Sequence, residues 1–230
     1  MMTNETTEST IDMLRARSSF YRVLESFYYK KLTEDQIDSM SATDYSAFGE
    51  VSPIIKEGFD DIRHYLARNR WGARERLAVD FTAAWVGTST YEGRYAEPFE
   101  SLFRGEESRL AGEPAAEVYR ALKRASLKVD EYIHLPSDHL SFEMEYLAIM
   151  GLRAADQLEA GDLNLARENL ETQRAFLNDH VLSWFDDFKA LSEKILKTRL
   201  YCGVLKVTKG FIELDDELLA DAIDLLGEAA

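Results

Sequence analysis

The chain has 230 residues, of which 27 are lysine or arginine and 42 are aspartate or glutamate, so its formal net charge is −15 at pH 7. One cysteine cannot form a disulfide within the chain and is too few for a zinc ribbon or an iron–sulfur cluster. The acidic balance argues against a general nucleic-acid binder, and the 46% of hydrophobic residues argues against disorder.

The N-terminal segment from Met1 to Thr10 has no basic region followed by an apolar run, so we do not expect it to be a secretory signal. It also lacks an Arg-Arg pair, so the chain is not expected to be a twin-arginine cargo itself. The longest apolar run, Tyr146 to Leu152, is far shorter than the roughly 20 residues that cross a bilayer. No integral membrane segment is expected, and the single cysteine favours a cytoplasmic location.

Apolar residues recur at spacings of three and four along nearly the whole chain, as in the series Val181, Trp184, Phe188 and Leu191. No stretch alternates apolar and polar residues in a sustained way, so no strand is predicted. The sequence therefore predicts an all-α fold, a single globular helical domain of about ten helices. The expected helices span residues 9–31, 34–41, 52–69, 73–86, 97–104, 114–127, 138–160, 163–178, 180–209 and 215–226.

Local start and stop signals place several of these helix ends. Thr33 with Gln36 forms a capping-box pattern, and Pro53 suits the first turn of the next helix. Gly87 is of the residue type that ends helices, and the pair Gly161–Asp162 suits the end of one helix and the cap of another.

Three segments depart from this regular pattern. Residues 87–97 contain two glycines and several small polar residues and are predicted to be a loop. Residues 129–136 are expected to be irregular as well. The tail from Glu213 to Ala230 has seven acidic residues and no basic one, with Leu and Ile at helical spacing. It predicts an amphipathic acidic helix whose charged face is solvated.

Catalytic motifs are missing from the sequence. It contains no phosphate-binding glycine loop, no dinucleotide-binding glycine turn and no nucleophile elbow. Cys202 lies among apolar residues and is expected to be a buried hydrophobe rather than a nucleophile. His64 and His180 lie in helical patterns without paired ligands and are expected to be structural or on the surface. The chain is therefore predicted not to be an enzyme.

The case for a metal site is weak. Glu131 and His134 match half of a di-iron carboxylate motif, but no second copy of that motif exists in the sequence. His139 and Glu143 have the spacing of a two-ligand clamp, but no third ligand is in view. We expect neither a metal nor another cofactor.

The most informative cluster is the segment Pro136–His139. Proline fixes the entry to a long helix, and Asp138 near the N-terminus of that helix can satisfy exposed backbone N–H groups. A cation is disfavoured there, so the pKa of His139 is expected to be held down unless an acidic neighbour compensates. Two interpretations stay open: a helix cap with a chance histidine, or a polar recognition corner beside a groove.

The stretch from Leu135 to Leu147 closely resembles the signature of the TorD/DmsD/NarJ family, which shows Pro-x-Asp-His followed by an acidic, leucine-rich helix. Pro136, Asp138 and His139 stand at the motif positions. Further segments resemble the family in the same order, although the helix before residue 87 lacks the arginine that family members usually carry. These segments are Arg22–Tyr29, Leu77–Gly87, Glu97–Leu102, Phe176–Trp184 and Phe211–Asp215.

The resemblance covers nearly the full chain and implies one TorD-like, all-helical chaperone domain over residues 1–230. It implies an N-terminal lobe of about residues 1–130 and a C-terminal lobe of about 131–230, with the 87–97 loop near a groove and linking the lobes. It also implies a monomer or a domain-swapped dimer.

The function implied by the resemblance is that of a cytoplasmic chaperone. Such a protein binds the signal or leader peptide of the catalytic subunit of a molybdopterin-dependent oxidoreductase and holds it until the cofactor is inserted. The alternatives are a metal- or nucleotide-dependent helical enzyme or ligand-binding protein, and an acidic helical scaffold without leader specificity.

The resemblance also implies the binding residues. Asp138 and His139 would contact the leader, and Glu100 and Ser101 belong to the same binding set, with support of the turn as their alternative role. Aromatic residues and prolines would line the pocket, although core packing stays an alternative for each aromatic residue. These pocket residues are Tyr28, Phe81, Trp85, Pro98, Phe99 and Pro136.

Overall fold

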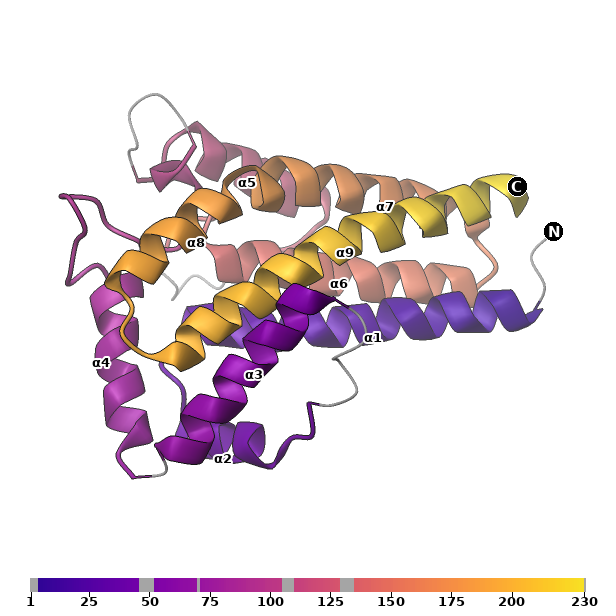
Figure 1. Cartoon of the computed structure of the whole chain (residues 1–230). Coiled ribbons are helices and arrows are strands. Elements are labelled where there is room, and N and C mark those ends of the chain that lie inside the picture. Colours follow the sequence, from indigo (N-terminus) through magenta and orange to yellow (C-terminus); the bar gives the residue numbers. More distant parts are fainter. Residues whose placement is uncertain (1–3, 46–51, 70, 105–109, 129–134, 230) are drawn as a thin grey trace. The chain divides into compact units, whose positions relative to one another are not determined.

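The computed structural model describes the chain except for residues 1–3, 46–51, 70, 105–109, 129–134 and 230 (Figure 1). The described residues form nine α-helices and no strand, which confirms the all-α class. The helices are Asn4–Tyr29 (α1), Glu34–Ala42 (α2), Pro53–Arg68 (α3), Ala73–Trp85 (α4), Glu113–Arg124 (α5), Leu140–Glu159 (α6), Leu163–Phe176 (α7), Ser183–Ile195 (α8) and Arg199–Ala229 (α9).

The predicted local signals work as expected at two helix ends. Thr33 caps α2 in a capping box, because its side chain accepts a hydrogen bond from the backbone N–H of Gln36 and its own N–H donates to the Gln36 side chain. Gly87, with φ of 72°, follows the last residues of α4 in the left-handed conformation that glycine tolerates.

The segment predicted as a helix over residues 97–104 is not one. It contains a single 3-10 turn, Glu100–Leu102 (η2), and the preceding Phe99 is extended. Phe99 forms an antiparallel β-bridge with His139, and this tertiary pairing prevents the turn from extending towards its N-terminus.

The predicted helix over residues 180–209 is also wrong, because α8 ends at Ile195 and α9 begins at Arg199. The cause is Asp80, a buried residue of α4. Its carboxylate accepts hydrogen bonds from the backbone N–H groups of Lys197 and Thr198, at 2.8 and 2.7 Å. These two donors serve Asp80 instead of continuing the helix ladder.

Two further helix boundaries differ from the prediction. The separate helix expected at residues 215–226 is part of α9, which continues to Ala229. The break expected near residue 179 is absent, since a π-helical segment, Leu177–Leu182 (η3), joins α7 directly to α8.

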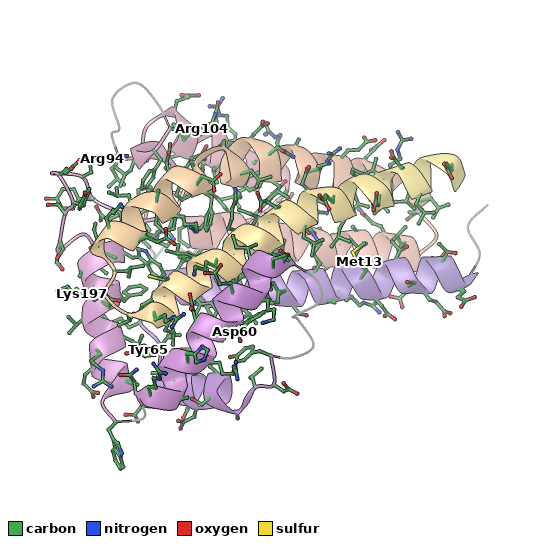
Figure 2. All side chains as sticks on the ribbon, viewed as in Figure 1. Met13, Asp60, Tyr65, Arg94, Arg104 and Lys197 are labelled. Carbon is green, nitrogen blue, oxygen red and sulfur yellow. The ribbon has the colours of Figure 1, made fainter. Side chains whose placement is uncertain are left out.

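The loop expected at residues 87–97 is confirmed as non-helical. Its tip is a tight turn in which the backbones of Tyr91 and Arg94 exchange two hydrogen bonds of 3.0 Å. Glu92 and Gly93 between them have positive φ angles of 51° and 78°. Figure 2 labels Arg94 at this tip.

Contacts group the chain into two compact units. Unit 1 contains Met1–Ser26, Phe99–Ser183 and Ile212–Ala230, and unit 2 contains Phe27–Pro98 and Trp184–Phe211. Both units take residues from each side of residue 130, so they do not coincide with the lobes of about 1–130 and 131–230 that the sequence predicts. That division into lobes stays a prediction.

Unit 1 is held together by a buried polar network as well as by its apolar core. The guanidinium of Arg17 on α1 pairs with both carboxylate oxygens of Asp215 on α9 and also donates to Gln173 on α7. The Tyr21 hydroxyl donates to Asp215 at 2.6 Å. All four residues are buried, so the pairing of Arg17 with Asp215 offsets the cost of placing both charges away from water.

Unit 2 depends on a close crossing of α3 and the first part of α9. A Cβ atom on Gly203 would lie 2.5 Å from the Gly58 carbonyl oxygen, so this approach requires glycine. Asp61, buried on α3, pairs with Arg199 and Lys206 of α9 beside the crossing.

Candidate binding site

Three of the predicted site residues lie in an aromatic cluster in unit 2. Trp85 packs against Tyr28 with ring centroids 4.8 Å apart, against Tyr201 at 4.9 Å and against Phe81 at 5.6 Å. Phe188 closes the cluster, 6.1 Å from Tyr28 and 6.2 Å from Trp85. Tyr28, Phe81 and Trp85 are at most 5% exposed, so they form part of the core of this unit.

Two polar atoms of this cluster form hydrogen bonds within unit 2. The Tyr28 hydroxyl lies 2.8 Å from the hydroxyl of Thr208, and the indole N–H of Trp85 donates to Ser192. Burial raises the pKa of the Tyr28 phenol well above its usual range, so it stays protonated. Pro98, at the end of the 86–98 loop, is buried too. A pocket-lining role for these residues stays a prediction.

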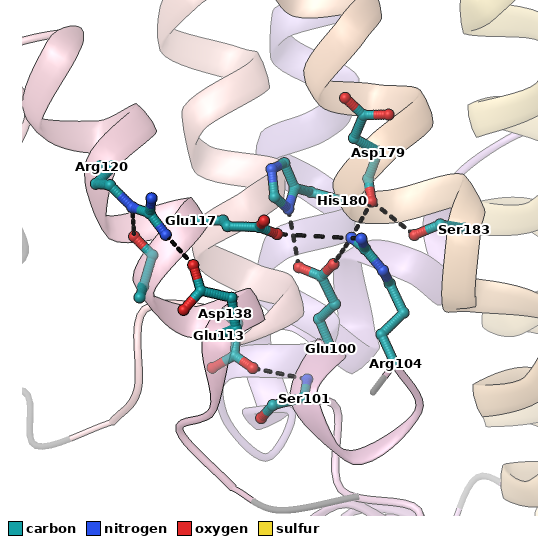
Figure 3. Close-up of polar contacts among 11 residues, drawn as sticks. Glu100, Ser101, Arg104, Glu113, Glu117, Arg120, Asp138, Asp179, His180 and Ser183 are labelled. Atoms are coloured by element: carbon teal, nitrogen blue, oxygen red, sulfur yellow. Dashed lines mark hydrogen bonds and ion pairs between the residues drawn. The ribbon is translucent and has the colours of Figure 1, made fainter. Parts of the chain in front are cut away.

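The other six predicted residues meet in unit 1, around the start of α6. The Glu100 backbone N–H donates to the Asp138 carbonyl at 3.0 Å. The Ser101 N–H donates to Oδ2 of the Asp138 carboxylate at 2.8 Å, as Figure 3 shows. Asp138 therefore caps η2 rather than α6, which the sequence analysis expected it to cap. Pro136 is half-buried in the turn that precedes α6.

Asp138 is fully buried, and its second carboxylate oxygen, Oδ1, has no hydrogen-bond donor among the described residues. A buried carboxylate oxygen without a donor is costly. This atom is therefore a place where a further donor would be stabilising.

His139 is the N-cap of α6, which begins at Leu140, two residues later than predicted. Its Nδ1 accepts from the Ser141 backbone N–H at 3.2 Å and lies 2.7 Å from the Ser141 hydroxyl. The ring stands edge-on to Phe99, with centroids 4.9 Å apart. Burial lowers the pKa of His139 to about 3, so the ring is neutral. The expected depression of this pKa is found, and burial is its cause.

Glu100 is the centre of a second set of contacts. Its buried carboxylate pairs with Arg104 and lies 3.0 Å from Nδ1 of His180 (Figure 3). Arg104 also donates to the carbonyl oxygen of Asp179. A structural or surface role is expected for His180 from the sequence, which does not predict its pairing with Glu100. Its partner lies 80 residues away, so the one available signal was that His180 stands in a segment resembling the family.

Two adjoining surface pockets lie beside this network in unit 1, and they share Arg124, Asp179 and His180. The larger has a volume of about 490 Å³ and a mainly apolar lining from α5, α6 and α7 that includes Ala121, Tyr146, Met150, Ala175 and Phe176. The smaller, of about 300 Å³, is polar and is lined by Arg104, Glu117, Arg120, Arg124, Asp179 and His180.

A metal site is not visible in the described part of the chain, where no group of three or more His, Cys, Asp and Glu side chains could hold an ion. Glu131 and His134 lie outside the described residues. Burial raises the pKa of the half-buried Cys202 thiol to about 11, which suits the expected non-nucleophilic role. Among the described helices, none has the length and hydropathy to cross a membrane.

Comparison with known proteins identifies the family. A family model described as nitrate reductase delta subunit matches residues 50–190, a span that contains η2, the Pro136–His139 turn and η3. The chain therefore belongs to the nitrate reductase delta subunit family, which confirms the TorD/DmsD/NarJ resemblance.

Three relatives are named as TorD chaperones. The protein of Vibrio vulnificus (strain YJ016) is 25% identical over 210 residues, which cover 88% of this chain and 94% of the relative. That of Vibrio cholerae (strain ATCC 39541) is 24% identical over 212 residues, covering 90% and 93%. That of Shewanella piezotolerans is 25% identical over 217 residues, covering 89% and 93%.

Proposed function

We propose that this member of the nitrate reductase delta subunit family is a cytoplasmic chaperone for a molybdopterin-dependent oxidoreductase. It binds the leader peptide of the catalytic subunit and holds that subunit for cofactor insertion and for assembly or export. The relatives named as TorD chaperones match it over most of both chains, which supports a chaperone of molybdoenzyme maturation. Like those relatives, the chain is not an enzyme.

The observation that carries the proposal is that residues from three segments meet in unit 1. Glu97–Leu102, Pro136–His139 and Phe176–Trp184 each resemble the family, and they are far apart in the sequence. Their residues Glu100, Asp138 and His180 are linked by the hydrogen bonds of one buried network (Figure 3). A buried polar network of this kind fixes the position of the surface beside it.

The surface next to the network has the chemistry that a leader requires. A leader combines an apolar helix-forming region with basic residues, so its receptor needs an apolar groove and an acidic group. The 490 Å³ pocket supplies the apolar lining. Asp179, which lines both pockets, supplies a carboxylate at this surface, and the fully buried Asp138 fixes the η2 turn through Ser101.

The test is calorimetric titration of the full chain with the leader peptide of the molybdoenzyme catalytic subunit encoded nearest to its gene. We expect a Kd in the micromolar range or tighter, and weaker binding when the apolar region is scrambled or Arg-Arg is replaced by Lys-Lys. Binding that is equally tight for the scrambled peptide would contradict specific recognition. Lack of binding to any leader would overturn the leader-peptide mechanism.

A further inference from the structure

The larger pocket of unit 1 has a floor that suits an apolar side chain. Ala121 on α5, Ala125 just after α5 and Ala175 on α7 are small, and they line the cavity of about 490 Å³ together with Met150 and Phe176. The Phe176 ring stacks against Tyr146 with centroids 4.1 Å apart, which fixes the aromatic wall. Because α5, α6 and α7 all belong to unit 1, this pocket lies within one compact unit.

Arg124 stands where this apolar pocket meets the polar one. It is exposed in the last turn of α5 and lines both pockets. Its two neighbours in the polar pocket are already paired, Arg104 with Glu100 and Arg120 with Glu113. Arg124 is exposed and makes no ion pair with any residue that the structure describes.

Tyr146 supplies a second donor at the same place. Tyr146 lines the apolar pocket, and the positive charges of Arg124 and Arg153 act on its phenol. Burial raises the pKa of the phenol, and the nearby charges of Arg124 and Arg153 only partly offset this, so the hydroxyl stays protonated and can donate.

The local charge contrasts with that of the whole molecule. The chain has a formal net charge of −15, yet three arginines line the 300 Å³ pocket. Two of them pair with Glu100 and Glu113, and Glu117 and Asp179 also line the pocket, so Arg124 is the lining arginine without a carboxylate partner among the described residues. One cation and one phenolic donor match one carboxylate, which Arg can hold by two parallel hydrogen bonds.

We propose that this pocket pair binds a client segment in which an apolar side chain is accompanied by an acidic one. The apolar side chain fills the cavity over Met150 and Phe176, and the carboxylate accepts hydrogen bonds from Arg124 and the Tyr146 hydroxyl. The inference rests on the proposed chaperone function and deepens it, since it places the bound segment and sets its orientation: its acidic residue lies at Arg124.

The π-helical segment Leu177–Leu182 supports a binding role for this surface. Such segments are rare within helices and occur frequently at functional sites. Here the segment carries Asp179 and His180, which line both pockets, and Glu100 fixes the His180 ring from below. The rim of the pocket is therefore held rigidly before any ligand arrives.

The test uses the full-length protein and overlapping 20-residue peptides that cover the leader and first part of the mature catalytic subunit named above. Each peptide that binds is remade with every Asp and Glu changed to Gln or Asn. The variants are Arg124→Gln, Tyr146→Phe and Ala175→Arg, the last placing a long side chain in the pocket. Lys123→Gln and Ala67→Arg are matched controls, because both positions are exposed and outside the pockets.

We expect Arg124→Gln to weaken binding of an acid-containing peptide about tenfold and Tyr146→Phe to weaken it a few-fold. Ala175→Arg should abolish binding, while both controls bind as the wild type does. Removing the acidic residue from the peptide should lower its affinity for the wild type about tenfold. The same change should not lower its affinity for Arg124→Gln further. When Arg124→Glu is combined with a peptide whose acidic residue is replaced by Lys, part of the affinity should return.

Each other outcome has a distinct meaning. If peptides bind but Arg124→Gln and Ala175→Arg bind equally well, the pocket assignment is wrong and the chaperone function stands. If the peptide's acidic residue does not matter, the carboxylate assignment is wrong. If inorganic phosphate or a nucleoside triphosphate competes at Arg124, the site is an anion site for a small molecule. If no peptide binds, the proposed function and this inference both fail.

Discussion

Unit 2 contains an aromatic cluster, and unit 1 contains a polar junction formed by Glu100, Asp138 and His180. Both regions join segments that are distant in the sequence, but different forces stabilise them. Trp85, Tyr28 and Phe81 pack ring against ring, with centroids 4.8 to 5.6 Å apart. At the junction, Glu100 and Asp138 are held by hydrogen bonds of about 3 Å to named donors. The cluster depends on buried contact area, and the junction depends on the direction of its hydrogen bonds.

The difference predicts how each region responds to change. Ring packing is non-directional and spreads over many contacts, so losing one ring leaves a cavity and costs stability. Losing one member of a hydrogen-bonded junction leaves buried partners unsatisfied and displaces the surface they position. Variants in the cluster should therefore affect unfolding most, and variants at the junction should affect binding as well.

The largest effect is expected for Trp85→Ala. The side chain is 3% exposed and contacts at least four rings of unit 2. Its loss should lower the free energy of unfolding by about 3–5 kcal/mol, measured by urea denaturation. Trp71→Ala is the matched control, because Trp71 is 90% exposed and its removal should cost less than about 0.5 kcal/mol. Equal losses for both tryptophans would contradict the packing argument.

Glu100→Ala should come next, with a loss of about 2–3 kcal/mol in the same measurement. It removes the carboxylate that pairs with Arg104 and His180. The loss stays below that of a fully buried ion pair because the Arg104 side chain is 35% exposed and can regain water. Glu117→Ala, 4.0 Å from the same arginine but more exposed, should cost under about 1 kcal/mol. If Glu100→Ala is as stable as the wild type, the contacts of Glu100 do not stabilise the fold.

His139 should make stability depend on pH. Its pKa is about 3 in the folded state and near 6.5 when unfolded, so between these values the unfolded chain binds more protons. Stability from this group is complete above about pH 6.5 and falls as the pH drops towards 3. Between pH 7 and 5 the wild type should lose about 2 kcal/mol more than His139→Asn, which keeps a capping acceptor but does not titrate. Identical pH profiles would show that the ring is protonated or exposed in the folded protein.

The smallest effect on stability, and the one most specific for function, is expected for Asp138→Asn. An asparagine oxygen can still accept from the Ser101 N–H, so the unfolding free energy should fall by only about 1 kcal/mol. Leader binding in the calorimetric titration should weaken about tenfold because the carboxylate charge is lost. Asp187→Asn, at an exposed position of α8, is the control and should bind normally.

Two results would revise the role of Asp138. If Asp138→Asn does not fold, the residue acts only as the cap of η2. If it folds and binds normally, the corner formed by Pro136–His139 is not part of the leader site, and the difference between the two regions concerns stability alone.

Sequence alone determined the helical class and many helix ends, since these depend on neighbours within a few positions. Apolar spacing predicted the helices, and the pair Thr33–Gln36 and Gly87 mark ends that the structure confirms. The resemblance around Pro136–His139 identified the family that the comparison confirms. In each case the signal is local, because helix periodicity and capping are set by residues three to four positions apart.

The tertiary structure decided what depends on residues far apart in the chain. Asp80 ends α8 by accepting hydrogen bonds from backbone groups 117 and 118 positions later, and no local signal marks that break. The pairing of Glu100 with His180, the burial of Trp85 and the pocket at Arg124 arise in the same way. Periodicity shows that a side chain faces inward, but only the packing of distant helices decides whether it meets a core, a partner or an open pocket.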